Sequence, residues 1–126
     1  MKNSDERRQS PRFYFTKEDG IHADFIHSAD PDFCMSVHIL SLSEDGLSFV
    51  VPRSEMEDAV EGDELTLVRI SHDSRLCELQ DIKLEIRHLI QGAENLICGA
   101  AFRRMKLEHA VALRDFILNN LSRYRS

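Results

Sequence analysis

Long apolar runs are missing from this sequence of 126 residues. A helix that spans a membrane needs about 18 to 20 consecutive apolar residues, and no segment approaches that length. The first residues include a lysine, Lys2, but no apolar stretch follows it, so a secretory signal peptide is not expected. We therefore expect no membrane insertion and a cytoplasmic location.

Cysteine is scarce, and the patterns that accompany metal sites and catalysis are missing. Cys34, Cys77 and Cys98 are odd in number and lack the spacing of a disulfide framework, which suits free thiols in a reducing compartment. Their apolar neighbours predict thiols that pack in the core. Neither C-x-x-C nor H-E-x-x-H occurs, so no metal site is predicted. A Gly-rich phosphate loop and a G-x-S-x-G elbow are also missing, and we predict that the protein is not an enzyme.

Positive charge is in short supply. The chain has 16 Lys and Arg against 22 Asp and Glu, a net charge of −6. Proteins that bind nucleic acids depend on a positive field, so DNA and RNA are not expected partners. An anionic ligand would have to be met by a local group of cations. Such a group lies near the N-terminus, at Arg7, Arg8 and Arg12.

Most of the chain shows the alternation of β-strands. Leu47, Phe49 and Val51 alternate with Ser48 and Val50, as in a strand with one buried face. Pro31 and its neighbours in 29–32 are expected to interrupt the sheet, and 54–60 to form a helical turn or a loop. Several short strands at regular spacing predict a closed or nearly closed barrel rather than βαβ units. The expected strands cover 13–15, 21–26, 35–42, 47–51, 64–71, 81–90 and 96–102.

The end of the chain changes its period. Apolar residues recur there in steps of three and four, which predicts one amphipathic helix, over about 107–124, lying on the barrel. Residues 13–126 are expected to form a single domain, and residues 1–12 a flexible segment that carries the arginines. The apolar positions of the helix are Leu107, Ala110, Leu113, Ile117, Leu121 and Tyr124.

A polar turn separates two of the expected strands at residues 43–46. Ser43 and Asp45 can bond their own backbone, and Gly46 can take a positive φ at no steric cost. With the upstream arginines, this turn resembles the two motifs of the PilZ domain family, bacterial receptors for cyclic di-GMP. Arg8-x-x-x-Arg12 matches the first motif, and Ser41-x-Ser43-x-x-Gly46 matches the second. The family usually has Asp or Asn at the position of Ser41. Softer similarities occur at 61–65 and 99–102.

The resemblance implies a fold and a site. The fold would be mainly β, a six-stranded antiparallel barrel of split or Greek-key-like type with a C-terminal helix. Arg8 and Arg12, with Arg7 beside them, would pair with phosphate oxygens or guanine edges and stack on bases. Ser43 would offer a hydroxyl to the ligand, and Gly46 would allow the tight reversal of the chain. Ser41 would weaken or alter base recognition. The candidates for additional stacking are Arg87 and His88.

The resemblance also implies a function. Cyclic di-GMP would order residues 6–12 against the Ser41–Gly46 turn, and the remodelled surface would signal to an unidentified protein partner. The downstream processes would be motility, biofilm formation or polysaccharide control, with no cofactor besides the ligand. The alternative is an adaptor of the same fold that binds cyclic di-GMP weakly or not at all and acts by protein contacts. The sequence leaves open whether the protein is a monomer or a weak dimer.

Overall fold

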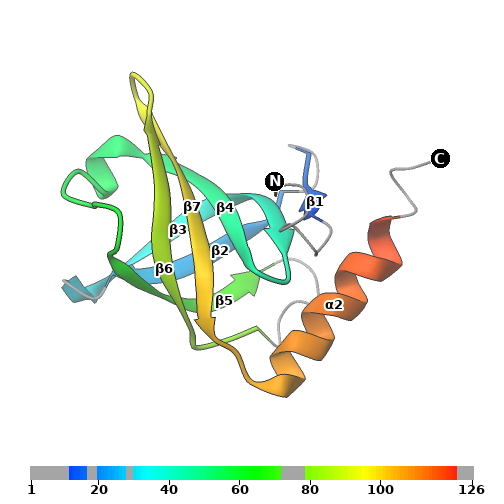
Figure 1. The fold of residues 1–126 in the computed structure, drawn as a ribbon. Coiled ribbons are helices and arrows are strands. Elements are labelled where there is room, and N and C mark those ends of the chain that lie inside the picture. The colour runs from blue at the N-terminus through cyan, green and yellow to red at the C-terminus, as the bar shows by residue number, and fades with distance from the viewer. Residues whose placement is uncertain (1–11, 17–19, 28–29, 72–78, 122–126) are drawn as a thin grey trace, which may run out of the picture.

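The computed structural model describes residues 12–16, 20–27, 30–71 and 79–121. These residues are mainly β structure, followed by one C-terminal helix (Figure 1). The elements are β1 (Arg12–Tyr14), β2 (His22–His27), β3 (Asp30–Ser43), β4 (Gly46–Pro52), the 3-10 turn η2 (Arg53–Glu55), β5 (Glu64–Ser71), β6 (Ile82–Gln91), β7 (Asn95–Arg104) and α2 (Leu107–Leu121).

The sheet closes on itself. Its strand order is β1-β3-β2-β5-β6-β7-β4, and an additional pairing of β3 with β4 joins the ends. All pairings are antiparallel. Strands β2 to β7 thus make a six-stranded barrel, and β1 is an extra strand on β3. The expected mainly β fold, with its six-stranded antiparallel barrel and C-terminal helix, is confirmed.

The strands follow the expected alternation, with one difference in β3. That strand begins at Asp30, so Pro31 lies inside it rather than in a break. The first five residues of β3 are exposed, and the register with β2 shifts between Ile26 and His27. Proline is tolerated at such irregular, exposed positions because no regular ladder bond is lost. In 54–60 the structure has η2 followed by turns.

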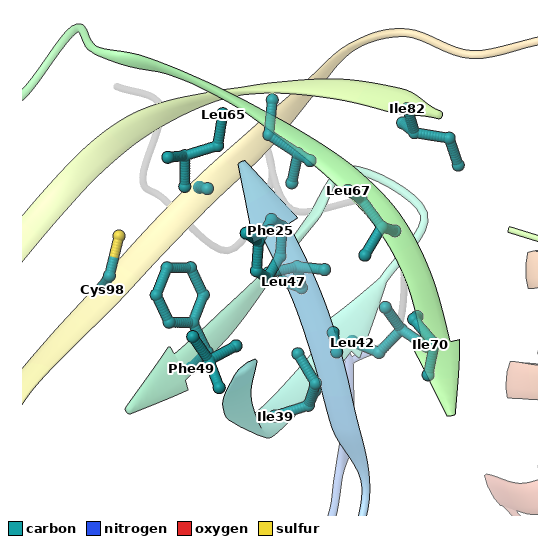
Figure 2. Packing of buried hydrophobic residues seen from close by; sticks show 14 of the residues in the cluster. Phe25, Ile39, Leu42, Leu47, Phe49, Leu65, Leu67, Ile70, Ile82 and Cys98 are labelled. Atoms are coloured by element: carbon teal, nitrogen blue, oxygen red, sulfur yellow. The ribbon is translucent and has the colours of Figure 1, made fainter. Parts of the chain in front are cut away.

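Apolar side chains from every strand of the barrel fill its interior (Figure 2). The rings of Phe25 and Phe49 stack at its centre, with centroids 5.0 Å apart. Leu42, Leu47 and Leu65 are also fully buried. Burial of each such side chain is worth about 1.5–3 kcal/mol, so this interior is the main source of the barrel's stability.

Helix α2 lies beside β1 and covers part of the barrel (Figure 1). It buries Leu113, Phe116 and Ile117, whereas Leu107, which the periodicity places on the buried face, is 78% exposed. The Phe116 ring meets Phe13 and Phe15 of the β1 segment, at centroid distances of 5.5 and 6.1 Å. The helix therefore fixes the position of β1. No helix in the described part of the chain is long and apolar enough to cross a membrane.

The two cysteines that the structure describes differ in their exposure to solvent. Cys98 is fully buried in the barrel interior, as expected. Cys34 is exposed, so the expectation that it packs in the core is wrong: it lies in the exposed first part of β3. Cys77 lies outside the described residues. Burial raises the pKa of the Cys98 thiol from 9.0 to about 12.

Gly46 is required by a close approach, not by a special backbone angle. Among the described glycines, positive φ occurs at Gly20 and Gly62 and not at Gly46, so the expected left-handed turn residue is wrong. A Cβ on Gly46 would lie 2.1 Å from the carbonyl oxygen of Ala100 on the neighbouring strand β7. Only a residue without a side chain lets β4 approach β7 this closely.

Substitution of Gly46 by Ala should therefore destabilise the barrel. The methyl group would push β4 from the β7 backbone, and overpacking of this kind costs about 1–3 kcal/mol or more. Urea denaturation of Gly46→Ala checks this, with Gly99→Ala as the control. A Cβ on Gly99 would meet His88 at an ordinary 3.6 Å. Equal stability of the two variants would contradict the steric explanation.

Cys98 should resist alkylation while the protein is folded. Iodoacetamide reacts with the thiolate, and with a pKa near 12 the folded Cys98 stays protonated at pH 8. In the unfolded chain the thiol ionises near pH 9, so stability falls as the pH rises from about 9 to 12. Mass spectrometry after brief labelling at pH 8 should find Cys34 modified, and Cys98 modified only in denaturant. Similar labelling rates for both would refute this.

Candidate functional site

A hollow of about 370 Å³ opens on the outer surface of the barrel beside the β3–β4 turn. This volume lies within the range of about 300–1,000 Å³ that is usual for small-molecule sites. Its lining combines two arginines, a tyrosine and a histidine with several small residues. The lining residues are Arg12, Tyr14, Ser41, Asp45, Gly46, Leu47, Ser48, Arg87, His88, Gly99, Ala100 and Ala101.

One cross-strand row forms the centre of the hollow. The strand registers pair Tyr14 with Ser41, Ser41 with Ser48, Ser48 with Gly99, and Gly99 with His88. The row runs from β1 over β3, β4 and β7 to β6, with a ring at each end and three small residues between. Adjacent strands are about 4.8 Å apart, so the two ring-bearing positions are roughly 19 Å apart along the sheet.

Arg12 is held at the rim by the serines of this row. Its Nη1 donates a hydrogen bond of 2.9 Å to Ser41 Oγ, and Ser41 Oγ lies 2.6 Å from Ser48 Oγ. Ser41 is 1% exposed, so its hydroxyl is engaged with these two partners rather than with solvent. The guanidinium keeps further N–H groups, because one hydrogen bond uses one of its five donors.

The turn between β3 and β4 is organised by Ser43. Its buried hydroxyl oxygen accepts from the backbone N–H of Asp45, at 3.2 Å, and of Gly46, at 3.3 Å. The backbone carbonyl of Asp45 accepts from the N–H of Phe102 on β7 at 2.9 Å. Ser43 therefore shapes the turn and does not line the hollow. Glu44 of the same turn lies 3.5 Å from Arg114 of α2.

The opposite wall comes from β6. Arg87 and His88 are both exposed, and Arg87 Nε lies 3.9 Å from a carboxylate oxygen of Glu85. A register shift between Ile86 and His88 turns the strand so that both side chains line the hollow. Gly99 beside His88 leaves the backbone accessible. A planar group could therefore lie against the floor next to the imidazole.

The hollow brings together five of the eight residues that the sequence singled out. Arg12, Ser41, Gly46, Arg87 and His88 line it. Ser43 supports it from beneath. Arg7 and Arg8 lie outside the described residues.

Sequence analysis missed three lining residues that could contact a ligand: Tyr14, Asp45 and Ser48. The alternation of Phe13, Tyr14 and Phe15 was the available signal for Tyr14, since a strand that buries its neighbours must present it outward. Tyr14 is 65% exposed. Within the described residues, no group of three His, Cys, Asp or Glu side chains could hold a metal ion.

Comparison with known proteins gives matches in structure only. No protein-family model matches the chain, and no curated protein sequence does. The PilZ domain of YcgR from Escherichia coli, solved with c-di-GMP, has a TM-score of 0.75 at 10% identity, with 94% of each chain covered. The c-di-GMP complex of MrkH from K. pneumonia has a TM-score of 0.72 at 13% identity, with 95% of this chain and 55% of MrkH covered.

A third solved structure is also similar in fold to this chain. The inhibitor of motility MotI/DgrA from Bacillus subtilis has a TM-score of 0.69 at 16% identity, with 95% of this chain and 54% of MotI covered. The chain thus spans about half the length of MrkH and MotI and nearly the whole YcgR domain. At these identities the likeness concerns architecture, and it agrees with the closed barrel, the extra strand and the C-terminal helix described above. The chain has the fold of a PilZ domain.

Proposed function

We propose that this protein is a receptor for cyclic di-GMP and that the hollow is its binding site. The observation that carries the proposal is the convergence of Arg12, Ser41, Gly46, Arg87 and His88 from four strands of the sheet on one hollow. Structures of the same fold, the YcgR domain and MrkH, were solved with c-di-GMP. Arginine suits this ligand because its planar fork pairs with phosphate oxygens and its face stacks on bases.

The row of small residues between two rings suits a ligand with two bases. Aromatic rings that stack have centroids about 4.5–7 Å apart, so two rings roughly 19 Å apart along the sheet cannot hold a single base between them. Each ring can instead stack on one base of a dinucleotide. Tyr14 would serve one guanine and His88 the other, while Arg12 and Arg87 meet the phosphates. Arg7 and Arg8 would add to this cationic set when the ligand orders them.

Binding would be coupled to ordering of the segment that carries the arginines. We propose residues 1–12 as that segment, of which Arg12 already belongs to β1, and residues 13–126 as the domain. Arg12 would exchange its hydrogen bond with Ser41 for phosphate contacts, drawing residues 6–12 over the turn. A segment that orders on binding pays its entropy cost only when ligand is present. The remodelled surface is then a signal for a protein partner.

The cellular role would be that of a non-enzymatic signalling protein in the bacterial cytoplasm, where second messengers are made and sensed. The partner would act in motility, biofilm formation or polysaccharide control. The motility inhibitor from B. subtilis, which has a similar fold, supports the first of these.

The alternative is an adaptor that binds little or no cyclic di-GMP. Its support is Ser41, whose hydroxyl is already engaged by Arg12 and Ser48. Withdrawal of Arg12 from Ser41 would break one hydrogen bond to a charged group, worth about 1.5–3 kcal/mol, and would leave Ser41 with Ser48 as its partner. The net gain from ligand binding would be smaller by that amount.

Calorimetric titration with cyclic di-GMP should give saturable binding that Arg8→Ala and Arg12→Ala each weaken by at least tenfold, about 1.4 kcal/mol. Loss of an arginine removes a charge-assisted contact to phosphate. The control is Arg53→Ala, in which an exposed arginine that donates to the carbonyls of Gly92 and Ala93 is removed. Arg53 directly follows β4, at the end of the strand that lies away from the hollow. At about 3.3 Å per residue along the strand, it is roughly 20 Å from Gly46.

The outcome decides between the two functions. Binding that survives Arg53→Ala and is lost with the other two variants supports the receptor. No heat from the wild-type protein at high micromolar ligand rejects it in favour of the adaptor.

Tyr14→Ala should weaken cyclic di-GMP binding about tenfold or more, and Tyr14→Phe should not. Stacking of a base on an aromatic side chain is worth about 1–3 kcal/mol, and phenylalanine keeps the ring. Because the chain has no tryptophan and only two tyrosines, tyrosine emission gives a direct second measurement, and ligand should quench it. If Tyr14→Ala binds as tightly as the wild type, Tyr14 is not a stacking residue.

A further inference from the structure

A carboxylate stands in the otherwise cationic hollow. Among the described residues that line it, Asp45 is the one acid, facing the same space as Arg12, Arg87 and His88. Its side chain is exposed, and within the described part of the chain its carboxylate has no hydrogen-bond or ion-pair partner. A negative charge at a site for phosphates opposes binding, so its presence calls for a different role.

The backbone holds Asp45 in place. Its N–H donates to Ser43 Oγ at 3.2 Å, and its carbonyl accepts from Phe102 N–H at 2.9 Å. The turn is thereby attached to both β3 and β7, and the following residue, Gly46, lies against Ala100. The side chain of Asp45 therefore projects from a fixed backbone, which is the arrangement required of a group that reads a ligand.

Guanine offers what a lone carboxylate accepts. Its Watson–Crick edge carries two neighbouring donors, N1–H and the N2 amino group, and bases outside a duplex are recognised on that edge. Adenine presents an acceptor, N1, at the corresponding place and would meet the carboxylate with repulsion. We propose that Asp45 accepts from the Watson–Crick edge of one guanine and so selects guanine over adenine in the bound dinucleotide. This inference rests on the proposed function of the hollow.

The assignment gives the acidic and basic residues separate tasks. The arginines meet the phosphates, which all cyclic dinucleotides share, and Asp45 meets the base edge, which differs between them. Ser41, whose hydroxyl keeps its contact with Ser48 Oγ when Arg12 turns to the phosphates, is then not needed for base selection.

The test is a titration of the wild type, Asp45→Asn and Asp45→Ala with cyclic di-GMP and with cyclic di-AMP. We expect both variants to lose about tenfold or more in affinity for cyclic di-GMP, since a two-point contact to a base edge has roughly that weight. The preference of both variants for cyclic di-GMP over cyclic di-AMP should fall in proportion to this loss. Asp32→Asn is the control: it removes the same charge from an exposed residue of β3, about 30 Å along the strand from Ser41. Thermal unfolding of the variants should match the wild type.

The test depends on whether the affinity for cyclic di-GMP falls or rises when the Asp45 carboxylate is removed. A carboxylate that only repels phosphate would, when removed, leave cyclic di-GMP affinity unchanged or raised, and that result overturns the role of Asp45 while the receptor stands. Loss of affinity with selectivity unchanged also overturns it. A wild type that binds neither dinucleotide overturns both the receptor and this inference.

Discussion

The approach of β4 to β7 at Gly46 is the constraint on which the rest of the structure depends. Six barrel strands close into one sheet because β4 pairs with β7 on one side and β3 on the other. At Gly46 this pairing leaves no room for a side chain. The turn before it, shaped by the Ser43 hydroxyl, thereby acquires a fixed place beside β7. The floor of the hollow is made of residues from these same strands, so the closure of the barrel and the shape of the hollow share one origin.

Much of the fold follows from local patterns in the sequence. Alternation of apolar and polar residues marks the strands, and the step of three and four marks α2, with Leu113 and Ile117 buried as expected. Local patterns do not determine the register, that is, which residues pair across neighbouring strands. The row from Tyr14 to His88 exists because irregularities between Ile39 and Ser41, and between Ile86 and His88, shift the pairing. Each shift reassigns which face a residue occupies, so the alignment of Ser41 with Ser48, and of Gly99 with His88, could not be derived from spacing alone.

The expectations that fail do so for tertiary reasons. The need for glycine at position 46 was predicted, but its cause is a neighbour on β7 that lies more than fifty residues away in the chain. Cys34 has apolar neighbours in sequence, yet the first part of β3 is exposed. Leu107 has the spacing of a buried helical residue, but the packing of α2 on β1 is made by Phe116 and its neighbours. For Gly46 and for the packing of α2, the decisive contact comes from another element.

Strand β1 differs from the strands of the barrel in one respect. Each barrel strand has partners on both sides, whereas β1, three residues long, is bonded to β3 alone. Its detachment would break a few backbone hydrogen bonds and the contact with Phe116 but leave the closed barrel whole. Local opening of this kind requires far less free energy than global unfolding. One wall of the hollow, with Arg12 and Tyr14, thus depends on the anchoring of β1 by a single neighbouring strand and by the ring of Phe116.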